Sequence, residues 1–116
     1  MIGVTAVGAV DEETILTVVH KLGESLGVSV GRVPALPEAA LAYDERRRQY
    51  VAPLILRDLA QSRPGDIPCV IGIAEVDLFI PMLSFVFGLA QLSGTVALIS
   101  LARLRSTFYY LPLDRA

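Results

Sequence analysis

The sequence has few of the residues that most often bind metals. Among its 116 residues it contains one histidine, His20, one cysteine, Cys69, and no tryptophan. A single cysteine excludes an internal disulfide and any metal cluster built on several cysteines, and we expect a protein of the reducing cytoplasm. We also predict no Ser-His-Asp or Cys-His nucleophile, because His20 is expected on a helix and Cys69 at the buried start of a strand.

Basic residues are also scarce. The formal net charge is −2, so the chain lacks the positive field that binding to nucleic acids requires. The only basic cluster is Arg46-Arg47-Arg48, which follows Asp44 and Glu45. We predict that this charge run lies on a solvated helix face.

Apolar residues, by contrast, make up 53% of the chain, and no charge occurs from Leu78 to Ala102. A run of this length is a candidate membrane span. It is interrupted by Pro81, Gly88 and the turn-like Gln91-Leu-Ser-Gly94, which favours two short strands joined by a hairpin turn. A small membrane-associated protein therefore ranks behind a soluble one, and the N-terminus does not resemble a secretory signal.

Hydrophobic periodicity predicts the remaining elements. Apolar runs at residues 2–7 and 69–74, and valines that alternate with small or polar residues at 28–33, indicate parallel strands. The run at 69–74 is expected in the middle of the sheet. An amphipathic stripe of Ile15, Val18, Val19, Leu22 and Leu26 predicts a helix that starts after Asp11 and ends at Gly27. Helical spacing returns between Asp44 and Ser62. Because Pro53 interrupts it, we expect either a kink there or a helix that starts near Ala52.

Strands at residues 85–90 and 95–101 complete the pattern, and their short link makes them antiparallel. The expected fold class is therefore α/β, with a mixed five-stranded sheet, parallel except for one antiparallel edge strand, and two helices.

Three segments of the last third of the chain occur in a characteristic order and spacing: Val76-Asp-Leu-Phe-Ile-Pro81, Phe85-Val-Phe-Gly88 and Ser100-Leu-Ala-Arg-Leu104. In these segments the chain resembles the archaemetzincins, a family of zinc-dependent peptidases. The likeness continues weakly into Phe108-Tyr-Tyr-Leu-Pro112, and Asp44 to Tyr50 looks like the start of a family helix. The resemblance implies a metzincin-like N-terminal subdomain with the same order of elements.

The zinc ligands of the family are missing. In archaemetzincins this stretch leads into a helix with His-Glu-x-x-His and a third histidine, whereas His20 is the only histidine here. Residues 1–116 are therefore expected to be one truncated archaemetzincin-like domain. We predict no zinc, no other cofactor and no catalytic residue, although complete family members use zinc.

Two groups of residues are candidates for function. In metzincins the antiparallel edge strand pairs with an extended peptide substrate, which implies a binding role for Phe85, Val86, Phe87, Gly88, Leu89 and Ala90. A plain sheet edge is an equally acceptable interpretation. Glu75 and Asp77 lie at the end of a strand, where α/β sheets gather ligands, but we interpret Asp77 as a residue that orders its loop.

Three functions follow from these patterns. The first is an inactive archaemetzincin-like domain that binds a peptide or protein segment, or associates with itself into a homo-oligomer because the missing helix leaves apolar surface uncovered. The second is a part of an active zinc peptidase whose catalytic helix lies on a missing segment or another chain. The third is a membrane-associated protein. We expect neither nucleic acid nor membrane as a partner.

Overall fold

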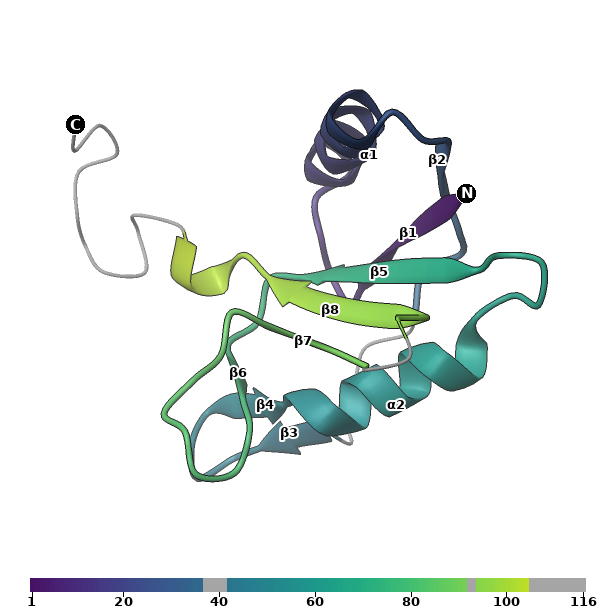
Figure 1. The fold of residues 1–116 in the computed structure, drawn as a ribbon. Helices are drawn as coiled ribbons and strands as arrows, with labels where there is room; N and C mark the ends of the chain where they lie inside the picture. Colours follow the sequence, from purple (N-terminus) through teal and green to yellow (C-terminus); the bar gives the residue numbers. More distant parts are fainter. Residues whose placement is uncertain (37–41, 92–93, 105–116) are drawn as a thin grey trace, which may run out of the picture.

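A five-stranded mixed sheet forms the centre of the computed structural model, which describes residues 1–36, 42–91 and 94–104 (Figure 1). The strand order is β2-β1-β5-β8-β7. Strands β1 (Ile2–Val7), β2 (Val30–Arg32), β5 (Cys69–Ala74) and β8 (Val96–Ser100) are parallel, and β7 (Gly88–Ala90) is antiparallel at the edge. The predicted fold class and the central position of β5 are confirmed.

Helix α1 (Glu12–Leu26) covers one face of the sheet. Its fully buried Ile15 packs in a cluster with Val4, Ala6 and Ile73 of β1 and β5. The helix ends at Gly27, whose φ of 65° is left-handed, and the Gly27 N–H donates to the carbonyl of Gly23. The predicted helix is confirmed, but its apolar stripe stops short, because Leu26 is exposed.

Helix α2 (Ala52–Ser62) covers the opposite face, as Figure 1 shows. Its Ile55 and Leu59 are buried against Val70, Val96 and Leu98 of the sheet. Gly72 of β5 permits this packing, because a Cβ at that position would lie 2.8 Å from a methyl carbon of Leu59 and 2.9 Å from one of Val7. Cys69, expected to be buried, is half-buried.

The segment before α2 corrects the predicted helix from Asp44. Strands β3 (Tyr43–Asp44) and β4 (Gln49–Val51) form an antiparallel hairpin. Strand β4 also pairs in parallel with β6 (Leu78–Phe79), which makes a second, three-stranded sheet. Residues 45–48 form the turn of this hairpin, and the Arg47 N–H donates to Oδ1 of Asp44 over 3.2 Å. Helix α2 instead begins at Ala52 with Pro53 in its first turn, the second of the two expected outcomes.

The uncharged run from Leu78 is divided among short strands. Strand β7 begins at Gly88 rather than at Phe85, and the Gln91–Gly94 turn leads into β8, with Gly94 donating to the carbonyl of Gln91. A 3-10 helix, η2 (Ala102–Leu104), follows β8. Within the three described ranges, neither α-helix is long and apolar enough to span a membrane. The segment Phe108–Pro112 lies outside the described residues.

Candidate functional site

The open edge of the five-stranded sheet is formed by β7. Paired residues are Gly88 with Ile99, Leu89 with Leu98, and Ala90 with Ala97. The Phe87 carbonyl accepts from the Ser100 N–H, and the Gln91 N–H donates to the Val96 carbonyl. The backbone groups of alternate residues in this segment therefore point toward β8. By the antiparallel pattern, the backbone N–H and C=O groups of Gly88 and Ala90 point away from β8, toward the open side.

The segment that leads into β7 is already paired on that open side. The Val86 N–H donates to the carbonyl of Leu78 over 2.9 Å, which joins it to β6. Of the six residues predicted to bind a peptide, Phe85 to Phe87 therefore precede the edge strand, and Gly88 to Ala90 form it. Gly88 lets β7 approach β8 closely, because a Cβ there would lie 2.6 Å from the Leu98 carbonyl oxygen.

A polar network centred on Asp77 lies beside this edge. Arg103 donates to the Asp77 carboxylate from Nε over 2.8 Å and from Nη2 over 3.0 Å. Gln49 donates from Nε2 to the same carboxylate over 2.8 Å and to the Ser84 carbonyl over 2.7 Å. The buried Gln49 amide also accepts from Arg47 Nε over 2.9 Å, so both ends of the amide have partners.

The network holds the Asp77 carboxylate in its charged form. Burial is the largest influence and raises the pKa of Asp77, but the hydrogen bonds from Arg103 and Gln49, together with the Arg103 charge, outweigh it, so the pKa lies below its ordinary value. The interpretation of Asp77 as a loop-ordering residue is confirmed by these contacts. They join the β5–β6 connection to β4 and to the segment after β8.

Two guanidinium groups also stack on aromatic rings. Arg47 lies 3.8 Å from the centre of the Phe79 ring, and Arg103 lies 4.0 Å from the centre of the Phe85 ring. Arg47 also donates from Nη2 to the carbonyls of Leu83, over 2.7 Å, and Ser84, over 3.2 Å. The prediction that the basic cluster is a solvated helix face is therefore wrong for Arg47, which is exposed but binds a neighbouring loop.

That loop, residues 80–87, connects β6 to β7 and carries three large apolar side chains at the surface. Met82 is 98% exposed, Leu83 is 49% exposed, and Phe87 is also exposed. We call these three side chains the loop surface. Figure 1 shows the loop extending away from the five-stranded sheet on the side of β3 and β4.

Comparison with known proteins places this arrangement in a family. No protein-family model matches the chain. Over 109 residues the chain is 40% identical to the archaemetzincin of Methanocaldococcus jannaschii, covering 94% of this chain and 58% of that protein. The structure matches the crystal structure of the Archaeoglobus fulgidus archaemetzincin complexed with malonate, with a TM-score of 0.77 and 29% identity over 93% of this chain and 66% of that one. The chain is an archaemetzincin homologue.

This archaemetzincin homologue matches only part of its relatives. It spans 58% of the Methanocaldococcus jannaschii protein and, at 42% identity over 92 residues, 48% of the archaemetzincin of Pyrococcus furiosus. A zinc-dependent peptidase from Methanocorpusculum labreanum matches with a TM-score of 0.73 and 25% identity over 98% of this chain and 70% of that one. The chemistry of these longer proteins therefore does not follow for this chain from similarity alone.

The described residues of this archaemetzincin homologue do not fit a zinc ion. His20 lies exposed on α1, where its Nε2 is 3.4 Å from a carboxylate oxygen of Glu24. Cys69 lies at the start of β5. In the part of the chain that the structure describes, no three His, Cys, Asp or Glu side chains gather into a group that holds a metal. A catalytic zinc needs three protein ligands, and the described residues do not supply them.

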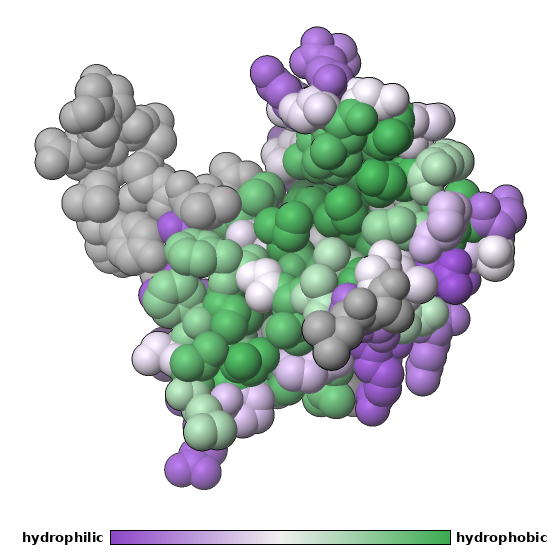
Figure 2. Space-filling view, in the orientation of Figure 1, coloured by the Kyte–Doolittle hydropathy of each residue, from purple (hydrophilic) through white to green (hydrophobic). Residues whose placement is uncertain are grey.

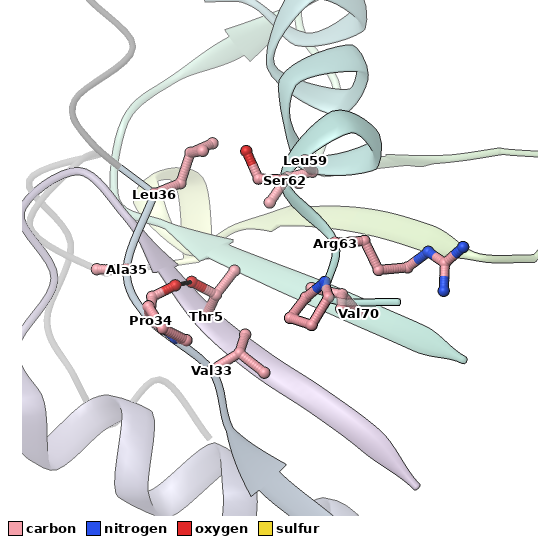
Figure 3. A pocket seen from close by; sticks show the side chains of 10 residues that line it. Thr5, Val33, Pro34, Ala35, Leu36, Leu59, Ser62, Arg63 and Val70 are labelled. Carbon is pink, nitrogen blue, oxygen red and sulfur yellow. Dashed lines mark hydrogen bonds between the residues drawn. The ribbon is translucent and has the colours of Figure 1, made fainter. Parts of the chain in front are cut away.

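A cavity of about 160 Å³ lies away from the edge strand, between β1, the segment after β2 and the end of α2 (Figure 3). Two of its polar side chains are already engaged. The Thr5 hydroxyl donates to the Pro34 carbonyl over 2.7 Å, and Arg63 Nη1 donates to the Ile67 carbonyl over 2.6 Å. Most of the remaining lining is apolar, so the cavity offers no set of converging polar groups for a specific ligand.

Apolar surface also remains on the sheet face that α1 covers in part. Ile99 of β8 points to this face, since its β5 partner Ile73 packs against α1, and Ile99 is exposed. Figure 2 shows apolar side chains gathered below α1 over the strands. Sequence analysis missed Gln49, Arg47 and Arg103 as organisers of the site. The signals in the sequence were the likeness of Arg47, Gln49 and Tyr50 to a family helix, which the structure contradicts, and the place of Arg103 in a family-like segment.

Proposed function

We propose that this chain is a non-catalytic archaemetzincin-like domain that binds an extended peptide segment along β7. The outward backbone groups of Gly88 and Ala90 are donors and acceptors that another strand satisfies with main-chain hydrogen bonds. Strand β7 is the last strand of the five-stranded sheet and carries no charged side chain. An uncharged edge of this kind is an effective template for a further strand.

We propose no peptidase activity for these 116 residues by themselves. Cleavage by a zinc peptidase needs an ion, a bound water and a carboxylate that takes the proton of that water. The single histidine of the sequence cannot supply the family's three imidazole ligands. We place the domain in a reducing cytoplasm, which the half-buried free thiol of Cys69 supports.

Backbone methylation of the ligand tests this function. Short synthetic peptides of alternating valine and threonine are prepared with N-methyl groups on either of the two alternate sets of residues. Binding to the full chain is measured by fluorescence anisotropy. We expect one methylated series to lose binding and the other to retain it, because only alternate peptide N–H groups face β7. Equal affinity in both series contradicts strand pairing.

A variant of the protein provides the matching test. Ala90→Pro removes an outward N–H but no hydrogen bond to β8, and proline is tolerated on edge strands. We expect the fold to persist, checked by circular dichroism, and peptide binding to fall. The control is Leu16→Ser, which changes an exposed residue of α1 and should leave peptide binding unchanged. A proline at this position would break the helix and is not used.

A second copy of the chain is the other occupant that we propose for the same edge. The exposed Ile99 and the unpaired side of β7 favour a homo-oligomer, because each carries surface that association would remove from water. Light scattering should show a dimer or larger species that Ala90→Pro converts to monomer. A compact monomer across the whole accessible concentration range contradicts self-association and leaves the peptide test intact.

One observation favours a second function. Because the chain spans only 58% and 48% of two relatives, it is alternatively one part of a zinc peptidase whose ligands lie on another segment. The coding sequence that follows Ala116 should then contain His-Glu-x-x-His, in frame or shifted. The downstream coding sequence separates the two functions, whereas stoichiometric zinc or proteolysis by the homogeneous chain of 116 residues overturns the non-catalytic proposal itself.

A further inference from the structure

The loop surface is held on a fixed backbone. Arg47 donates to the carbonyls of Leu83 and Ser84, and Gln49 donates to the Ser84 carbonyl. The bond from Val86 to Leu78 fixes the far end of the loop. Large apolar side chains such as Met82 are unfavourable in water, so their display on an ordered loop is typical of a preorganised binding surface.

The position of β6 places this loop next to the peptide that would pair with β7. Since Leu78 occupies the open side at Val86, an added strand cannot continue in the sheet beyond Gly88. A peptide longer than the short edge must leave the sheet beside Phe87. From there it meets the 80–87 loop, whose last residue is Phe87 itself.

The turn between β3 and β4 adds positive charge beside the loop. Arg47 contacts the loop through neutral carbonyls, and its other partner is the neutral Gln49 amide. Arg46 and Arg48 flank it and are exposed, and among the described residues neither makes an ion pair. The turn thus has three guanidinium groups against the carboxylates of Asp44 and Glu45, and it favours an acidic group in a ligand.

We propose that the loop surface and this basic turn form a second part of the peptide site. It takes the segment that leaves β7, and the segment that fits carries a large apolar side chain next to an acidic one. The apolar side chain packs on Met82, Leu83 and Phe87, and the carboxylate faces Arg46 and Arg48. This inference rests on the proposed pairing of a peptide with β7.

Two peptides test the preference. Both peptides share a core of alternating valine and threonine. One carries the extension Phe-Asp-Asp and the other carries Ser-Asn-Asn. Each peptide is made with its extension at the C-terminus and, separately, at the N-terminus. We expect the Phe-Asp-Asp form to bind the full chain at least about fivefold more tightly, since burial of one aromatic side chain at a partly open surface gives a gain of this order. The gain should shrink as salt is added.

Variants assign the gain to the surface. Met82→Ser with Leu83→Ser should remove most of the preference, and Arg46→Gln with Arg48→Gln should remove its salt-dependent part. Leu16→Ser is the matched control, because Leu16 is 53% exposed and Leu83 is 49% exposed, and α1 lies on the other side of the molecule (Figure 1). The control should keep the full preference. Thermal melting confirms that the variants fold.

The outcomes separate the two proposals. If both peptides bind equally and the loop variants change nothing, the loop inference is wrong while strand pairing stands. If neither peptide binds, both proposals fall. Vesicles of phosphatidylserine and phosphatidylcholine test a lipid-binding loop. The chain would sediment with these vesicles, the Met82 and Leu83 variant would not, and the two peptides would bind with equal affinity. That result would overturn the peptide-binding loop.

Discussion

Arg103 binds the carboxylate of Asp77 through two nitrogens, with Nε at 2.8 Å and Nη2 at 3.0 Å. Both side chains are largely shielded from water, since Asp77 is 14% exposed and Arg103 is 22% exposed. Bidentate pairs of this kind fix orientation as well as adding energy. Here the pair joins the connection between β5 and β6 to the segment after β8.

This pair should contribute measurably to stability. We expect Asp77→Asn to lower the free energy of unfolding by about 1–3 kcal/mol, because it weakens hydrogen bonds to a shielded charged group. A double-mutant cycle with Arg103→Met, followed by urea denaturation, isolates the interaction. The control is the exposed pair of Arg57 and Asp58, 3.9 Å apart, whose coupling should be about 0.5 kcal/mol or less. Equal coupling in the two pairs would refute the structural role.

The same pair predicts a pH dependence. The pKa of Asp77 is lower in the folded chain than the ordinary value of 3.8. The unfolded chain therefore binds the proton first as pH falls, and folding is penalised progressively below the ordinary pKa. The stabilisation is complete above about pH 5 and is lost as pH falls through the folded pKa. Unfolding free energies measured from pH 7 to pH 2 should converge for the wild type and Asp77→Asn.

Much of the fold could be predicted because its signals are local. Cys69 to Ala74 is a continuous apolar run, and a strand buried on both faces of a parallel sheet needs such a run. The stripe through Ile15 likewise predicts α1, and Gly27 marks its end. In contrast, the segment from Asp44 has helical spacing but forms a hairpin. The pairing of Tyr50 with Tyr43 and with Leu78 decides this, and the second is a long-range contact.

The network around the site could not be predicted for the same reason. Arg103 is 26 residues from Asp77 in the sequence, and Gln49 is 28 residues away. Spacing along the chain carries no information about contacts that only the assembled sheets create. Arg47 illustrates the difficulty, because a charge run normally indicates solvent exposure, whereas its guanidinium reaches backbone carbonyls of a loop distant in sequence.

Packing of α2 on the sheet gives a third prediction. Gly72→Ala should lower the free energy of unfolding by about 1–3 kcal/mol, since the new methyl group overlaps a Leu59 methyl carbon at 2.8 Å. Gly65→Ala is the control, because a Cβ there meets no atom within 4 Å. If Gly72→Ala is combined with Leu59→Val, part of the loss should be recovered. Urea denaturation of the four proteins measures this, and a loss no larger than in Gly65→Ala would show that the contact is relieved without cost.

Anchoring of the 80–87 loop by Arg47 gives the last prediction. Arg47→Met keeps an unbranched side chain at this position but removes the guanidinium over Phe79, together with its hydrogen bonds to the Leu83 and Ser84 carbonyls and to the Gln49 amide. Because the side chain is exposed, we expect a loss of only about 0.5–1.5 kcal/mol in global stability. The loop should open more readily, so the Val86 amide, which donates to Leu78, should exchange its hydrogen faster.

Arg46→Met is the matched control in the same turn and should leave that exchange rate unchanged. If the Val86 amide exchanges at the wild-type rate in both variants, the loop is ordered by its own turn at Ile80–Leu83, and Arg47 does not preorganise it. If Arg47→Met alone accelerates exchange, the display of Met82 depends on a contact made by the β3–β4 hairpin, and the hairpin that replaced the expected helix is what fixes the loop surface.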